Sequence, residues 1–347
     1  MRNSKFELVR IISVFGIIVM HTLGKYQNDV EGINLIFTLL LNQIFNMGVS
    51  LFALISGYFG VRLTAKKFIT LECLVIYYSL LNVAVSVYLT GAFSVKELLL
   101  AFIPVSARNY WYIQGYMLVL LFSPFINKYL NQITKYEYKK LLLLLIIVFC
   151  ICPTLTNHYV MNDYGKGPMT ILFMYICGRY IGMYLKSEEY NNKKLLLYLI
   201  ILQTIGFVGN CVITVSGMKG DGIAMPFAAD FSVFIVFSSF IVFLLVKKGE
   251  FKSKIINYIS SCGLGIYLSE RVINMIIGNY ISLDDFINKR EFILLILVQS
   301  LFVMLVGIIV EIIRKGAVKV FFSSIKYDRI DDYIRRLLET HLNKGKE

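Results

Sequence analysis

The chain has 347 residues, of which 57% are hydrophobic and 16% are charged, and its formal net charge is +13. Soluble globular proteins carry charge on about 25% of their residues, so this chain lacks the polar surface that a soluble protein of its size requires. The composition therefore excludes a soluble domain and indicates that many apolar side chains face lipid.

Apolar segments of membrane-spanning length recur along the chain. A helix needs about 20 mostly apolar residues to cross a bilayer. Ten segments satisfy this requirement, namely 8–24, 34–59, 68–90, 112–130, 139–157, 168–186, 195–216, 227–246, 256–280 and 292–314. We therefore predict an all-α, polytopic integral membrane protein with about ten transmembrane helices in one bundle, formed by residues 1–315.

The first of these segments carries three polar residues, Glu7, Arg10 and His21. Because Arg10 interrupts the apolar stretch and no small-residue cleavage site follows, we interpret it as a retained helix rather than a signal peptide. Arg10 and His21 are separated by only about 20° around such a helix and by about 16 Å along it. Glu7 lies within about 40° of His21 on the same face. Charged groups inside a membrane are costly and commonly functional, so this face is a candidate site.

The spacing suits a thioester donor with a long flexible arm. The guanidinium of Arg10 could hold the phosphates of such a donor while its carbonyl lies near His21. Neutral His21 could then act as general base for an acceptor hydroxyl, or accept the acyl group itself. The structural alternatives are that Arg10 extends to the interface and pairs with Glu7, and that His21 is an interface residue at the end of a span.

Basic residues cluster between the apolar segments, which favours an inner membrane face over a nucleic-acid groove. With ten spans both termini lie on one face, and that face collects 25 Lys and Arg residues against 7 on the other. This bias predicts cytoplasmic termini. Residues 316–347 form a basic amphipathic tail, predicted to lie along the cytoplasmic membrane surface or to form a plain cytosolic helix. The six cysteines lack metal-ligand spacing, so no metal site is predicted.

Short motifs resemble, in chain order, the acyltransferase-3 family of membrane acyltransferases. Arg10 and His21 have the spacing of that family's first-helix Arg and His. The other matching motifs are Leu54-Ile55-Ser56-Gly57-Tyr58-Phe59, the basic group Arg62, Lys66 and Lys67, Trp111-Tyr112 followed by Leu121-Phe122-Ser123-Pro124, and Gly265-Ile266-Tyr267-Leu268. The family often has a His two residues after the last motif, where this chain has Glu270.

The resemblance implies a function and a set of roles. Members transfer acyl groups, commonly acetyl from acetyl-CoA in the cytoplasm, to sugars of surface polysaccharides, lipid-linked glycans or related acceptors. For this chain the resemblance implies a cell-membrane O-acyltransferase with His21 as catalytic residue. The expected donor-binding residues are Glu7, Arg10, Arg62, Lys66 and Lys67, and the expected acceptor-binding residues are Trp111, Tyr112 and Glu270. Trp111 and Tyr112 could instead form an interfacial aromatic belt, and Glu270 could simply pair with Arg271.

Two other functions are compatible with the composition. A polytopic transporter or flippase of glycan intermediates could use Arg10, Arg179 and Arg271 to line a path. A glycan polymerase fits less well, because its acceptor loops are usually long and the predicted outer loops are short. The sequence does not identify the acceptor sugar or the acyl chain length. It also leaves the oligomeric state open, and a homo-oligomer is compatible with it.

Overall fold

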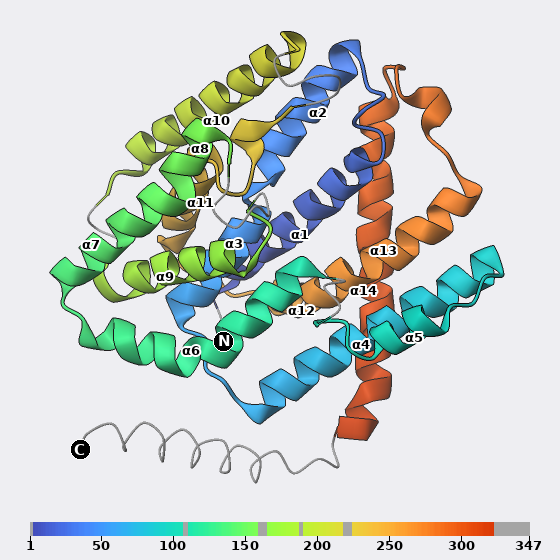
Figure 1. The fold of residues 1–347 in the computed structure, drawn as a ribbon, viewed down its shortest axis with the longest axis horizontal. Helices are drawn as coiled ribbons and strands as arrows, with labels where there is room; N and C mark the ends of the chain where they lie inside the picture. The colour runs from blue at the N-terminus through green and yellow to red at the C-terminus, as the bar shows by residue number, and fades with distance from the viewer. Residues whose placement is uncertain (1–2, 107–109, 159–164, 187–189, 218–223, 323–347) are drawn as a thin grey trace.

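The computed structural model describes residues 3–106, 110–158, 165–186, 190–217 and 224–322, and over these residues it contains helices and no strands (Figure 1). The elements are, in chain order, α1 Ser4–Gly24, α2 Gly32–Phe45, α3 Met47–Phe59, α4 Ala65–Thr90, α5 Val95–Ala101, α6 Trp111–Gln132, α7 Lys135–Ile146, the π-helical turn η1 Ile147–Ile151, α8 Cys152–Thr156, α9 Pro168–Tyr184, α10 Asn192–Val215, the 3-10 turn η3 Pro226–Ala228, α11 Val233–Lys247, α12 Lys254–Ser261, α13 Gly263–Tyr280, the 3-10 turn η4 Asp284–Phe286 and α14 Phe292–Phe322.

The predicted all-α membrane architecture is confirmed, whereas the count of ten spans stays a prediction. Each of the ten predicted segments coincides with one helix or with two or three consecutive helical elements. Within the described part of the chain, seven are long and apolar enough to cross a membrane: α1, α2 with α3, α4, α7 through α8, α10, the stretch from η3 through α11, and α14. The helices α6, α9 and α13 are not among them. α9 has only 17 residues, and α13 carries Glu270 and Arg271.

Helix α3 lies at the centre of the bundle and packs directly on α9. A Cβ atom added to Gly57 would lie 2.1 Å from the carbonyl oxygen of Tyr175, and one added to Gly178 would lie 2.2 Å from that of Leu54. The two glycines therefore bring the backbones of the helices into contact. Close packing through small residues is how membrane helices associate where no hydrophobic effect drives them together.

Peripheral helices present apolar side chains outward. The helices α7 and α10 lie along one edge of the bundle, and α4 and α5 lie along the opposite edge (Figure 1). Only Gly206 and Asn210 are buried on α10, while Leu197, Ile200 and Val208 are exposed on it. Helix α14 likewise exposes Leu294, Leu301 and Ile313. Such surfaces match the apolar excess of the composition and suit contact with lipid tails.

The 3-10 turn η3 and the irregular residues after it lie inside this bundle, and amide side chains fix the position of η3. The Asn46 side chain, at the break between α2 and α3, donates to the carbonyl oxygen of Ala228. Asn210 of α10 accepts a hydrogen bond from the backbone N–H of Phe227 at 3.0 Å and donates to Gln43 at 3.0 Å. Irregular backbone is tolerated at membrane depth when side chains satisfy its polar groups or when it lines a cavity.

Helix α14 continues through the domain boundary predicted at residue 315 as far as Phe322, the last described residue. The remainder of the predicted tail, residues 323–347, lies outside the described residues, so its placement on the membrane surface stays a prediction.

Candidate active site

A cavity of about 890 Å³ runs along one face of α1. The α1 residues that line it include Glu7, Arg10, Val14, Ile17, His21 and Gly24. These positions recur every three or four residues, as one face of a helix requires. From Glu7 to Gly24 the helix rises by about 25 Å, which approaches the thickness of the hydrocarbon core of a bilayer. The face predicted to hold Arg10 and His21 together is therefore the face that borders the cavity.

Arg10 and Glu7 form an ion pair at one end of this cavity. The Nη1 atom of Arg10 lies 2.8 Å from Oε1 and 3.0 Å from Oε2 of Glu7. The hydroxyl of Ser260, at the end of α12, also donates to Oε2. Glu7 is buried, so the partners compensate a carboxylate that would otherwise be costly at this depth. The pair predicted as a structural alternative thus exists, and both of its members line the cavity.

His21 contacts a carboxylate from the far end of the sequence. Its Nδ1 atom lies 2.8 Å from Oε2 of Glu270 on α13. The side chain of His21 is 47% exposed whereas that of Glu270 is 7% exposed, so the imidazole borders the cavity and the carboxylate lies behind it. Because an ionised carboxylate only accepts hydrogen bonds, Nδ1 donates to Glu270, and in the neutral imidazole Nε2 then keeps its lone pair. This is the arrangement of a His oriented for general-base work.

Glu270 is itself held by α13 and α14. The side-chain amide of Asn274, one turn later on α13, donates to Oε1 of Glu270 at 3.2 Å. Gln299 of α14 donates in turn to the side-chain oxygen of Asn274 at 3.3 Å. Glu270 does not line the cavity, so the structure places it behind His21 rather than among the lining residues.

Aromatic side chains form a wall between α6 and α13. Trp111, Tyr112 and Tyr267 all line the cavity. The ring of Tyr112 packs at 6.2 Å from that of Tyr267, and the ring of Tyr267 lies 6.3 Å from the imidazole of His21. Tyr112 also contacts Phe52 of α3 at 6.1 Å between ring centroids. The residues predicted from the sequence as acceptor-binding aromatics therefore border the same cavity as His21.

A group of polar residues that was not predicted from the sequence also lines this cavity. Gln27, Lys166 and Asp230 line it, together with Asn46 and the backbone around Ala228. Asp230 is 2% exposed and lies just before α11. Its position inside the predicted span 227–246 was a signal that could have been used, because a carboxylate within a span is commonly functional. Lys166 could not have been found, since its segment lacks any recognisable pattern.

The basic group Arg62, Lys66 and Lys67 lies outside the cavity lining. All three side chains are exposed, Arg62 on the connection between α3 and α4 and the two lysines in the first turn of α4. The ring of Phe6 packs at 5.5 Å from Tyr58 and at 5.2 Å from Phe59, so this connection lies beside the beginning of α1. The group is therefore near the end of α1 that carries Glu7 and Arg10, and a role in binding a donor stays a prediction.

Comparison with known proteins gave one match. A family model described as an acyltransferase domain, that of the acyltransferase-3 family, matches residues 3–313, nearly the whole chain. Comparison with curated proteins and with solved structures gave no match.

Proposed function

Since this chain belongs to the acyltransferase-3 family, we propose that it is a membrane O-acyltransferase that moves an acyl group from cytoplasmic acyl-CoA to a sugar hydroxyl. An acetyl group is the expected cargo, and a surface polysaccharide or a lipid-linked glycan is the expected acceptor. The observation that carries this proposal is a cavity along α1 that is bordered by Arg10 near one end and by His21, which contacts Glu270, near the other.

The imidazole of His21 supplies the base. Its Nε2 atom takes the proton of the acceptor hydroxyl as the hydroxyl oxygen attacks the thioester carbonyl. The carbon–sulfur bond then breaks, the thiolate of CoA leaves, and the protonated imidazole returns the proton to it. The carboxylate of Glu270 stabilises the imidazolium that forms in between. A route in which His21 accepts the acyl group first is the alternative chemistry at the same atom.

The two ends of the cavity suit the two substrates. Arg10 is a guanidinium in reach of phosphate oxygens, and the axial separation from His21 of about 16 Å fits a donor whose thioester is carried on a long arm. On the side of His21, the aromatic wall and the polar residues Gln27, Asn46 and Asp230 suit a sugar, which presents apolar ring faces and many hydroxyl groups.

The proposed location is the cell membrane with both termini cytoplasmic. The bias of 25 basic residues to 7 supports this orientation, because basic loops remain on the cytoplasmic face. In this orientation the beginning of α1, with Glu7 and Arg10, faces the cytoplasm, where acyl-CoA is found.

The test is a comparison of surface glycans by mass spectrometry in cells with the protein, without it, and with His21→Ala. We expect the acetyl mass increment on one glycan to disappear without the protein and to stay absent with His21→Ala. Unchanged acylation in cells that lack the protein would contradict the enzyme. A glycan that is missing from the surface altogether, rather than present without its acyl group, would instead favour the transporter.

A further inference from the structure

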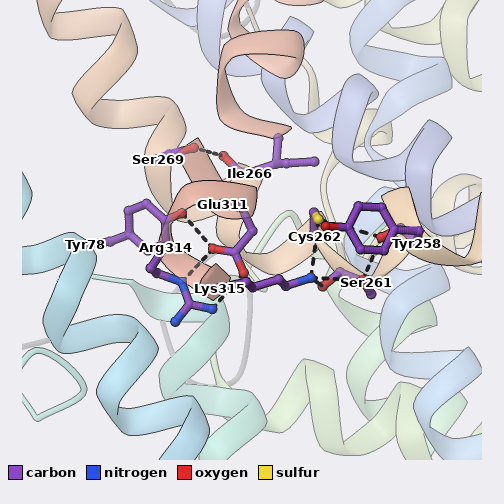
Figure 2. Close-up of polar contacts among 9 residues, drawn as sticks. All are labelled: Tyr78, Tyr258, Ser261, Cys262, Ile266, Ser269, Glu311, Arg314 and Lys315. Carbon is purple, nitrogen blue, oxygen red and sulfur yellow. Dashed lines mark hydrogen bonds and ion pairs between the residues drawn. The ribbon is translucent and has the colours of Figure 1, made fainter. Parts of the chain in front are cut away.

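The last described turns of α14 meet the junction between α12 and α13 through one lysine (Figure 2). The Nζ atom of Lys315 donates to the backbone oxygen and to the hydroxyl of Ser261, both at 2.9 Å, and lies 3.3 Å from Sγ of Cys262. The ring of Tyr258 lies 5.6 Å from the same atom. All of these partners are neutral. Among the described residues, no carboxylate lies within ion-pair distance of Lys315.

The carboxylate nearest in sequence is already occupied. Glu311 accepts from Nε of Arg314 at 2.7 Å through Oε2 and from Nη2 at 2.8 Å through Oε1. The hydroxyl of Tyr78 donates to Oε2 at 2.8 Å. Both oxygens are therefore used, and Glu311 and Arg314 are buried (Figure 2). This closed network compensates the charge of Arg314 and leaves that of Lys315 without a counterpart among the described residues.

The same network fixes where Lys315 lies. A Cβ atom on Gly265 would lie 2.3 Å from the carboxylate of Glu311, so α13 and α14 approach closely at this level because Gly265 has no side chain. The ion pair and the hydroxyl of Tyr78 then hold the turn of α14 directly before Lys315. The ammonium group is consequently presented to Ser261 by a buried and well-packed support rather than by a loop.

Ser261 connects this lysine to the candidate active site. Ser260, Ser261 and Gly263 line the cavity at the end that also holds Glu7 and Arg10. Ser261 lines the cavity and is also exposed at the surface, so the cavity opens to the surroundings at this residue. Arg10 is neutralised there by Glu7. Lys315 thus adds an uncompensated positive charge to the mouth of the cavity, as far as the described residues show.

We propose that Lys315 binds a phosphate group of the acyl donor at this mouth, beside Arg10. This inference rests on the proposed function and names a donor contact that lies apart from Arg62, Lys66 and Lys67. Acyl-CoA carries a pyrophosphate and a further phosphate on its ribose. A charged oxygen is a stronger partner for an ammonium group than the neutral oxygens of Ser261, so Nζ exchanges those contacts for phosphate oxygens when the donor enters.

The experiment compares two donors that share the thioester but differ in phosphate. Purified parent protein and Lys315→Gln are assayed for acyl transfer from acetyl-CoA and from S-acetylpantetheine, which lacks phosphate. We expect the KM for acetyl-CoA to rise roughly tenfold or more, the usual effect of losing one charged hydrogen bond. The kcat with acetyl-CoA should stay within about twofold, and the kinetics with S-acetylpantetheine should not change. Lys315→Arg, which keeps the charge, should retain most of the affinity.

Lys254→Gln is the matched control, because Lys254 is an exposed lysine on α12 that does not line the cavity. Equal losses with both donors would show that Lys315 only holds the helix junction, and unchanged kinetics with acetyl-CoA would also overturn the proposal. If the proposed function itself is wrong, the result is different, because the parent protein then transfers no acyl group from either donor. In that event, calorimetric titration of CoA into the parent protein and into Lys315→Gln still tests the phosphate contact. Equal dissociation constants for CoA would refute it.

Discussion

The Nδ1 atom of His21 and the Oε2 atom of Glu270 lie 2.8 Å apart, although 249 positions separate the two residues in the sequence. This contact favours a role for Glu270 in positioning His21, because Glu270 does not line the cavity. The role in binding the acceptor that was predicted from the sequence stays a prediction.

Glu270→Gln tests this relationship. The amide has nearly the same shape, but it can donate to Nδ1 and so favour the tautomer that carries the proton on Nε2, where the base is needed. We expect kcat to fall by about 10²-fold or more, with little change in the KM of either substrate. Steady-state kinetics with both substrates varied would measure this. A raised acceptor KM with an unchanged kcat would restore the acceptor-binding role.

His21→Ala should abolish transfer and leave acyl-CoA binding nearly intact. Loss of a general base typically costs about 10²–10⁴-fold in rate. The measurement is acyl transfer by purified protein whose fold is verified by its thermal unfolding profile, together with calorimetric binding of acyl-CoA. His158→Ala serves as control, since His158 does not line the cavity. Activity of the His21 variant within about threefold of the parent would refute the catalytic assignment.

The basic group at the beginning of α4 is tested by charge removal. Replacement of all three basic residues by Gln (Arg62, Lys66 and Lys67) should weaken acyl-CoA binding. The effect should be clearest at low ionic strength, where exposed charges are least screened. Titrations at low and at physiological salt would show the effect as a difference that shrinks with added salt. Identical affinities at low salt would remove these residues from the donor site and leave Arg10 and Lys315 as the cationic candidates.

Trp111→Ala examines the aromatic wall. If the indole stacks on a sugar ring, its removal should raise the KM of the acceptor by about two- to tenfold, because packing on an aromatic face contributes about 0.5–1.5 kcal/mol. The KM of the donor should not move. Normal acceptor kinetics in a folded variant would leave Trp111 with the role of an interfacial aromatic.

Topology can be measured with a single reporter. Lys346→Cys in a background without the six native cysteines should resist an impermeant thiol reagent applied to intact cells, because the charge bias places the terminus in the cytoplasm. The same variant should label after permeabilisation, which shows that the thiol is accessible. Ready labelling of intact cells would reverse the assigned orientation.

Local periodicity accounts for the part of the site that the sequence predicted. The shared face of Arg10 and His21 follows from helix geometry alone, and the structure gives that face a cavity. The partner of His21 was not predictable in the same way, because it depends on how α1 and α13 pack. The position of Lys315 was not predictable for the same reason, since it depends on a tertiary contact with Ser261, which lines the cavity.

The count of membrane spans shows where hydropathy is a weak predictor of helices. Hydropathy recognises helices such as α10 and α14, whose outward residues are apolar. It is less decisive for α13, where Glu270 and Asn274 are compensated by polar partners inside the bundle. Helices that build a site in a membrane protein carry the polar residues that weaken the signal used to detect them.

The backbone contact between α3 and α9 bears on how large an acceptor the cavity admits. Val49, Phe52 and Ser56 of α3 line the cavity, while Gly57 and Gly178 join α3 to α9 without an intervening layer of side chains. Because carbonyl oxygens approach the two glycines closely there, α3 has little room to move outward toward α9. We therefore expect the α3 side of the cavity to stay in place when a ligand enters and to limit the width of the acceptor.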